Sequence, residues 1–244
     1  EKRELDTRSV QRTFSSLDEF FASGPSMLKS GVYRVEHGLP ILVKWTNKNA
    51  DLTIVSFSAA GTREMKTMPV FSGVNATKDL PCNVLLFSDP TMLLDRDTTI
   101  TWFAGSRFQP NLQSDISKII LAFCNGGDVL LTGGSGGGYS ALVQHYLIGD
   151  ATTFVVNPST RIAGRPIFQS YIEKMWNAAS VEDLPSSLIV DLADVFSERV
   201  NGEIYYLQNS LDQNFVRNYF WPFLDSVSKE TQLYCITPCY GRGH

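Results

Sequence analysis

The segment DVLLTGGSGGGYSALVQHYLIG, residues 128–149, constrains the fold more than any other part of the sequence. Residues 128–134 form an apolar run typical of a buried strand, and this run ends in glycines. Residues 138–149 are predicted to form a helix, and Ser135 lies in the short connection between the two. A strand that passes so directly into a helix is typical of an α/β architecture.

Short strands and helices alternate along most of the chain. The pattern predicts a hairpin over 31–45, buried strands over 51–61, 83–89, 152–158, 204–209 and 232–237, helices over 112–123 and 214–227, and a short strand or loop over 99–105. Strands of this length separated by helices indicate βαβ units and a parallel sheet. The predicted fold class is therefore α/β, with a mostly parallel sheet flanked by helices. No linker divides the 244 residues, so we expect a single domain over 1–244.

Two segments lie outside this alternation. Residues 1–30 are expected to form an N-terminal arm, in which 14–28 is a helix or irregular. Residues 159–200 contain helical patches and no clear strand. In this architecture the second segment is predicted to be an insertion or lid over the carboxyl edge of the sheet, a common place for substrate selectivity to reside.

Composition excludes several classes of function. The net charge is −4 and the basic residues are scattered, the nearest approach to a cluster being Lys2, Arg3, Arg8 and Arg12. The chain therefore lacks the basic stripe of a nucleic-acid-binding protein. No apolar run reaches the length of a membrane span, and the first residues are too polar for a signal peptide, so we expect no membrane span and a cytoplasmic protein.

The four cysteines are expected to be free thiols. They are Cys82, Cys124, Cys235 and Cys239. Only the last two are close in sequence, and their CxxxC spacing has no second pair with which to complete a zinc site. No metal and no cofactor are expected.

The residues around Ser135 fit the pattern G-x-S-x-G, in the strand-to-helix context that this motif requires. A serine hydroxyl is a weak nucleophile unless a base takes its proton and nearby donors hold the resulting oxyanion. A P-loop would need Lys and then Ser or Thr after the last glycine, where this chain has Tyr139 and Ser140. A dinucleotide-binding loop or a plain tight turn would also use such glycines, but a dinucleotide fingerprint normally opens the first βα unit.

The histidine expected to act as the base is His244. In enzymes with this motif the acid and then the histidine follow the serine along the chain. His145 lies in the helix directly after Ser135, too close in sequence to fold back, and His37 precedes the motif in a predicted hairpin turn. His244 follows the last predicted strand by a short loop, although it is the final residue.

The expected acid is Asp212, which follows the predicted strand 204–209. We expect its carboxylate to accept a hydrogen bond from the imidazole of His244. Asp212 would also suit the N-cap of the next helix, because Asp is a favoured capping residue. Further candidate acids lie in the predicted lid and are Glu182, Asp191 and Asp194.

An oxyanion hole needs the backbone amide of the residue after the nucleophile and one amide from the loop after an early strand. The first is that of Gly136. For the second, Ala59 and Ala60 in the segment 56–62 are small enough to let their amides face the site. The same segment is also consistent with a turn of small residues that has no catalytic role.

These motifs resemble the α/β-hydrolase superfamily from about residue 31 to residue 244, on Ser135 in GGSGG, Asp212 in YLQNSLD and His244 in CYGRGH. The segments YYLQNSLDQNFV and GRGH also look like a bacterial branch found beside surface-glycan and accessory-secretion genes. Some members of that branch resemble sugar O-acetyltransferases or deacetylases. The glycine-saturated motif, the missing HGGG motif and the terminal histidine depart from the superfamily pattern.

The leading hypothesis is a serine esterase that cleaves a small-molecule or glycan ester through an acyl-enzyme. The same three residues also suit an O-acyltransferase or deacetylase that acts on sugar hydroxyls, or a peptidase. The hypothesis from another class is a non-catalytic hydrolase fold that serves as a binding partner.

Overall fold

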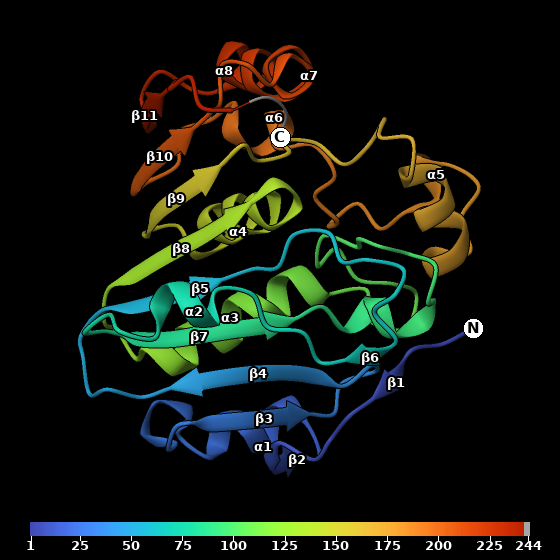
Figure 1. Ribbon diagram of the computed structural model, residues 1–244, viewed down its shortest axis with the longest axis vertical. Helices are drawn as coiled ribbons and strands as arrows, with labels where there is room; N and C mark the ends of the chain where they lie inside the picture. The colour runs from blue at the N-terminus through green and yellow to red at the C-terminus, as the bar shows by residue number, and fades with distance from the viewer. Residues whose placement is uncertain (242–244) are drawn as a thin grey trace.

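The fold centres on a nine-stranded sheet, described by a computed structural model for residues 1–241 (Figure 1). In order across the sheet the strands are β11 (Gln232–Ile236), β10 (Glu203–Leu207), β9 (Thr152–Val156), β8 (Val129–Gly134), β5 (Thr53–Ser56), β7 (Asn83–Ser88), β4 (Ile41–Thr46), β3 (Gly31–Val35) and β2 (Val10–Phe14). Strand β4 is antiparallel to both neighbours, and every other adjacent pair is parallel. The predicted α/β class with a mostly parallel sheet is confirmed.

The chain changes direction across the sheet at β5. From β5 it passes to β7 on one side, and from β7 it returns to β8 on the other side of β5. From β8 onward the strands are added in sequence order toward β11. Open α/β sheets bind their ligands beyond the carboxyl ends of the strands at such a reversal. Ser135, which directly follows β8, therefore lies where this topology places a site.

Short helices connect these strands. They are α1 (Leu17–Ala22), α2 (Val74–Thr77), α3 (Leu112–Cys124), α4 (Ser135–Ile148), α5 (Phe168–Tyr171), α6 (Ala193–Phe196), α7 (Gln213–Phe215) and α8 (Trp221–Ser226). Two π-helical turns, Ile172–Trp176 and Val216–Phe220, continue α5 and join α7 to α8. Residues 99–105 form a loop, which is the second of the two conformations predicted for them.

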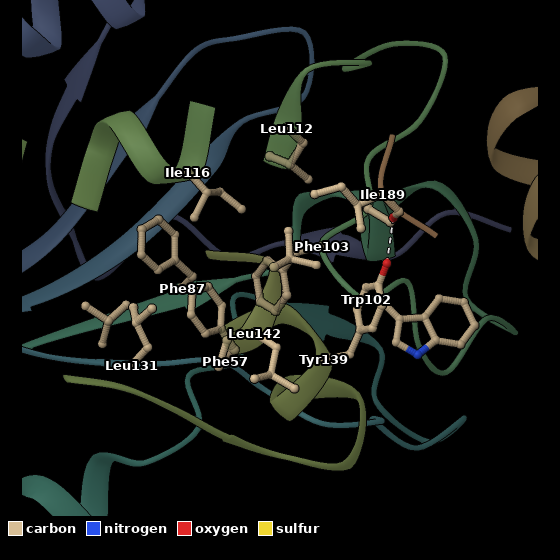
Figure 2. Close-up of a cluster of buried hydrophobic side chains, with 14 of the residues drawn as sticks. Phe57, Phe87, Trp102, Phe103, Leu112, Ile116, Leu131, Tyr139, Leu142 and Ile189 are labelled. Atoms are coloured by element: carbon tan, nitrogen blue, oxygen red, sulfur yellow. Dashed lines mark hydrogen bonds between the residues drawn. The ribbon is translucent and has the colours of Figure 1, made fainter. Parts of the chain in front are cut away.

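The main core lies between the sheet and helices α3 and α4. The apolar positions that predict α3, at spacings of three and four residues, are buried: Leu112, Ile116, Ile119, Ile120 and Phe123. Helix α4 is buried along most of its length because α3 covers the side that the sheet does not. Figure 2 shows part of this core, in which side chains from the sheet meet those of α3 and α4. The opposite face of the sheet holds a smaller cluster beside α2.

Residues 159–200, which we call the cover, lie on the side to which the parallel strands point (Figure 1). The Tyr171 hydroxyl donates to the Gly105 carbonyl at 2.8 Å, and the Tyr139 hydroxyl of α4 donates to the Ile189 carbonyl at 2.6 Å (Figure 2). Both tyrosines are buried. These contacts fix the cover to the domain beneath it, so it differs from a flap joined only at its ends.

The N-terminal arm predicted for 1–30 contributes more structure than the sequence indicated. Residues Val10–Phe14 form the edge strand β2, which pairs in parallel with β3. Farther toward the N-terminus, β1 (Glu4–Leu5) pairs with β6 (Thr67–Met68) in a separate two-stranded sheet. No strand was predicted for residues 1–13. The segment 14–28, predicted to be helical or irregular, contains α1.

No helix formed by residues 1–241 has the length and apolar character needed to cross a membrane.

Candidate active site

Ser135 occupies a strained turn at the centre of the sheet. Strand β8 ends at Gly134 and helix α4 begins at Ser135, whose φ is 49°. This is the left-handed region, which costs a residue with a Cβ atom about 1 kcal/mol or more. Serine adopts it here at the carboxyl end of a central parallel strand. Ser135 therefore lies on a strained turn between a strand and a helix, as the sequence motif requires.

Close packing explains two of the glycines around Ser135. A Cβ atom at Gly133 would lie 2.4 Å from the carbonyl carbon and oxygen of Gly137. A Cβ atom at Gly137 would lie 2.4 Å from the carbonyl oxygen of Phe57, which directly follows β5. The turn thus folds back on itself and presses against the end of β5. At Gly134, by contrast, a Cβ atom would meet only the Val156 carbonyl oxygen, at an ordinary 3.5 Å.

The amide of Gly136 lies in the first turn of α4, where backbone N–H groups have no acceptor within the helix. The loop after β5 carries the other two predicted donors, Ala59 and Ala60, and both are exposed. Neither of these two alanine amides donates to an acceptor among residues 1–241. The contact between Gly137 and Phe57 brings the start of this loop against the turn at Ser135.

A small cavity of about 60 Å³ adjoins this loop. Its lining includes Ala59, Ala60, Ile100 and Trp102, together with three methionines, Met65, Met68 and Met92. A Cβ atom at Gly136 would lie 2.1 Å from Ile100 Cδ1 and 3.2 Å from Trp102 Cδ1. Because the same two side chains line the cavity and contact Gly136, the cavity lies next to the residue that follows Ser135.

The loop that carries Trp102 is held in an unusual conformation by a buried carboxylate. Trp102 and Phe103 both have a φ of 52°. Asp89, which follows β7, accepts hydrogen bonds from the Thr101 hydroxyl at 2.6 Å and from the Phe103 amide at 2.7 Å. Burial raises the pKa of the Asp89 carboxyl, and its hydrogen bonds oppose that rise. Neither the strained pair nor the role of Asp89 was predicted.

Asp212 caps helix α7, which is the structural role that its residue type predicts. Its Oδ1 accepts from the amide of Phe215 at 3.2 Å, and only 5% of the residue is exposed. Its own amide donates to the Asn209 carbonyl at 3.1 Å. A carboxylate has acceptor capacity on two oxygens, so a cap does not exhaust it. The catalytic role of Asp212 stays a prediction.

A buried polar network joins the loops that follow β8, β9 and β10. The Ser159 amide donates to the Ser135 carbonyl at 3.0 Å. The Asn157 side-chain oxygen accepts from the Asn209 amide at 2.7 Å, and Asn157 itself has a φ of 41°. The network links the turn at Ser135 to the loop that carries Asp212, and it places both at the same edge of the sheet.

Neither histidine within residues 1–241 forms a hydrogen bond with Ser135. His145, in the last turn of α4, is buried, and its Nδ1 lies 2.9 Å from the Thr153 hydroxyl. Burial lowers the pKa of His145 to about 4. His37 lies in the β3–β4 turn and pairs with Asp115 of α3 at 2.9 Å. His244, the predicted base, lies outside the described residues.

Arg165 is a residue of the site that sequence reasoning missed. It lies in the cover and is half-buried. Its Nη1 donates to the Ser159 hydroxyl at 2.5 Å. Its guanidinium carbon lies 5.9 Å from the ring centroids of Trp102 and Phe215 and 5.7 Å from that of Tyr219. The signal in the sequence is weak, because these partners come from three separate segments.

A mostly parallel sheet whose central strand leads through a left-handed serine into a helix defines a fold of the α/β-hydrolase type. No protein-family model matches the sequence, and no curated protein matches it either. Comparison with solved structures therefore supplies the known relatives of the fold.

Three solved structures illustrate the likeness. The capsule O-acetyltransferase of Neisseria meningitidis serogroup A is 16% identical, with a TM-score of 0.63 over 89% of this chain and 91% of that one. A chain of the Glycosylation Associate Protein (Gap123) complex from Streptococcus agalactiae is 15% identical, with a TM-score of 0.54 over 84% and 40%. Porphyromonas gingivalis dipeptidyl peptidase 4 is 11% identical, with a TM-score of 0.55 over 88% and 33%. At these identities the likeness shows the fold.

Proposed function

We propose that the protein is a serine esterase that acts through an acyl-enzyme on Ser135. The observation that carries this proposal is the left-handed φ of 49° at Ser135, between β8 and α4. Serine carries a Cβ atom, so this conformation costs free energy that glycine would avoid. Such strain is typical of a residue held in place for chemistry.

In the proposed mechanism Ser135 Oγ attacks the ester carbonyl carbon while His244 takes the hydroxyl proton. Asp212 orients the imidazole and stabilises its protonated form. The amides of Gly136 and of Ala59 or Ala60 hold the oxyanion of the tetrahedral intermediate. The alcohol leaves with the proton from His244. In the second half-reaction His244 takes a proton from water, which attacks the acyl-enzyme, and the acid is released as Ser135 Oγ takes the proton back from His244.

The cavity beside Ala59 and Ala60 is where we place the acyl group. Its volume of about 60 Å³ has room for roughly four water-sized groups. Ile100, Trp102 and the methionines around it supply apolar contacts. The substrate class that fits is therefore an ester of a short acyl chain.

A second candidate function is acyl transfer to a sugar hydroxyl. It is favoured by the likeness to the capsule O-acetyltransferase, which extends over most of both chains, whereas the peptidase matches over only a third of its own length. One structure of that acetyltransferase contains CoA. In this candidate the acyl-enzyme is the same, and a sugar hydroxyl replaces water as the acceptor.

Labelling with a fluorophosphonate probe tests the nucleophile directly. We expect the wild type to be labelled and Ser135→Ala to remain unlabelled, with Ser140→Ala as the matched control because Ser140 lies on the same helix and donates to the Trp102 carbonyl. Equal labelling of wild type and Ser135→Ala would refute the proposal.

The acceptor is identified by product analysis. Wild type is incubated with p-nitrophenyl acetate or acetyl-CoA, with and without a panel of mono- and oligosaccharides. Free acetate in both cases supports the esterase, and an acetylated sugar that depends on Ser135 supports the transferase. A well-folded protein that shows no turnover and no labelling supports the non-catalytic binding partner instead.

A further inference from the structure

The charge on Arg165 has no carboxylate to balance it within the described part of the chain, residues 1–241. Among residues 1–241, no Asp or Glu oxygen lies within 4.0 Å of its guanidinium. The other arginines of this part of the chain without an acidic partner are exposed, except Arg3, whose guanidinium donates to five backbone carbonyls. Among residues 1–241, Arg165 is therefore a half-buried arginine whose positive charge is not balanced by a carboxylate.

Most of the N–H donors of Arg165 also have no hydrogen-bond acceptor among the residues that the structure describes. A guanidinium has five N–H donors in one plane, and Nη1 uses one of them on Ser159. The rings of Trp102, Phe215 and Tyr219 stabilise the cation but are poor acceptors for those in-plane donors. Aromatic walls also reduce the access of water, which strengthens any charge-assisted hydrogen bond formed there.

Two of the partners of Arg165 connect it to the turn at Ser135. The Ser159 hydroxyl accepts from Arg165, and the Ser159 amide donates to the Ser135 carbonyl. Trp102 carries a ring beside the guanidinium and also lies against Gly136. The guanidinium is thus separated from the proposed nucleophile and from the residue after it by one intervening residue in each case.

A third partner connects Arg165 to the predicted acid. The ring of Phe215 lies beside the guanidinium, and the Phe215 amide donates to Asp212. The same arginine is therefore in contact with neighbours of Ser135, Gly136 and Asp212. A structural arginine that only packed the cover would need no such position.

We infer that Arg165 binds a negatively charged group of the substrate, a carboxylate or a phosphate, close to the ester attacked by Ser135. This inference rests on the proposed function and narrows its substrate class to acidic esters. The planar fork of a guanidinium matches either oxyanion through two parallel hydrogen bonds. Arg165 is a binding residue and takes no part in proton transfer.

Three aryl acetates that differ in charge test the inference: methyl 4-acetoxybenzoate, 4-acetoxybenzoate and 4-acetoxyphenyl phosphate. For Arg165→Gln we expect kcat/KM on the charged esters to fall by about 10- to 100-fold, mainly through KM, since a charge-assisted pair is lost. On the neutral ester the change should stay within about threefold. The charged ester with the larger loss identifies the anion as a carboxylate or a phosphate.

Two variants serve as controls. Arg165→Lys keeps the charge without the fork and should recover part of the lost preference. Arg161→Gln removes an exposed charge from the same segment and should leave the ratio of charged to neutral turnover unchanged. An equal loss on all three esters in Arg165→Gln would show that Arg165 only supports the structure, and it would overturn the inference.

A binding measurement keeps this test independent of turnover. Inorganic phosphate should raise the melting temperature of the wild type and of Ser135→Ala, and it should raise that of Arg165→Gln much less. An equal rise in all three proteins, or none in any, overturns the inference. If phosphate binds at Arg165 but the fluorophosphonate probe does not label Ser135, the proposed esterase function is rejected and the anion site at Arg165 is retained.

Discussion

The Ser159 amide donates a 3.0 Å hydrogen bond to the carbonyl oxygen of Ser135. The first residue of the cover is thereby attached to the left-handed serine of the proposed site. Ser159 is fully buried and also accepts from Arg165. Any movement of the cover near Ser159 would therefore displace the backbone of the proposed nucleophile.

Ser135→Gly should be more stable than Ser135→Ala, and both variants should lose activity. Glycine adopts a φ of 49° without the Cβ penalty, so the free energy of unfolding should exceed that of Ser135→Ala by about 1 kcal/mol. For a chain of this size that corresponds to a melting temperature about 2–4 °C higher. Both variants should lose at least about 10³-fold in ester turnover. Calorimetry and a p-nitrophenyl acetate assay check the pair, and a lower melting temperature for glycine would argue against strain at this position.

Gly137→Ala and Gly134→Ala should differ in their effects. A Cβ atom at Gly137 would clash with the Phe57 backbone, which has no freedom to rotate away, so we expect a loss of about 1–3 kcal/mol in unfolding free energy and a displaced 58–61 loop. At Gly134 the added atom meets an ordinary contact, and the loss should stay within about 0.5 kcal/mol. Urea unfolding measures both. Equal tolerance at the two positions would contradict the packing of this turn.

Acyl-chain preference should follow the size of the cavity. We expect kcat/KM for p-nitrophenyl esters to fall by at least about tenfold between the acetyl and hexanoyl esters, because the cavity of about 60 Å³ admits only a short chain. Met65→Ala should reduce this discrimination, since Met65 lines the cavity and is only half-buried. A chain-length profile that is unchanged in Met65→Ala would place the acyl group elsewhere.

Stability should fall in acid because His145 is buried in its neutral form. Its folded pKa of about 4 lies below the ordinary value of 6.5, so the unfolded chain binds a proton that the folded protein rejects between these two pH values. The sign is therefore a loss of stability as the pH falls from 6.5 to 4, of about 2 kcal/mol by pH 5. Urea unfolding from pH 7.5 to 4.5 should show a steeper loss for the wild type than for His145→Gln, which keeps a group able to bond Thr153. Parallel curves would contradict this role of His145.

The sequence predicted those parts of the fold that depend on local pattern. The alternation in 31–45 indicated the β3–β4 hairpin, and the apolar spacing in 112–123 indicated α3, because burial repeats with the period of the element. Strand β2 was missed because three of its five side chains, Gln11, Arg12 and Thr13, are exposed at the sheet edge. An edge strand is defined by its pairing with β3, and its own residues carry little of that information.

In the proposed site too, the sequence predicted the residue that depends on local pattern and missed those that depend on distant partners. Ser135 was recognised because the glycines that its turn requires are adjacent in sequence. The left-handed pair Trp102 and Phe103 was missed because its conformation depends on Asp89, a residue more than ten positions away. Arg165 was missed because its neighbours come from distant parts of the chain. His244 lies outside the described residues, and its role stays a prediction.

Arg3 was counted with the basic residues at the start of the chain, yet only 4% of it is exposed. Its guanidinium donates to the carbonyls of Met65 and Met92, whose side chains line the cavity, and to those of Asp95, Arg96 and Thr98. Trypsin needs an extended, accessible arginine, so the bond after Arg3 should resist cleavage for as long as the cavity wall is intact. Cleavage by trypsin after Arg3 would therefore show that the wall of the cavity proposed for the acyl group has unfolded.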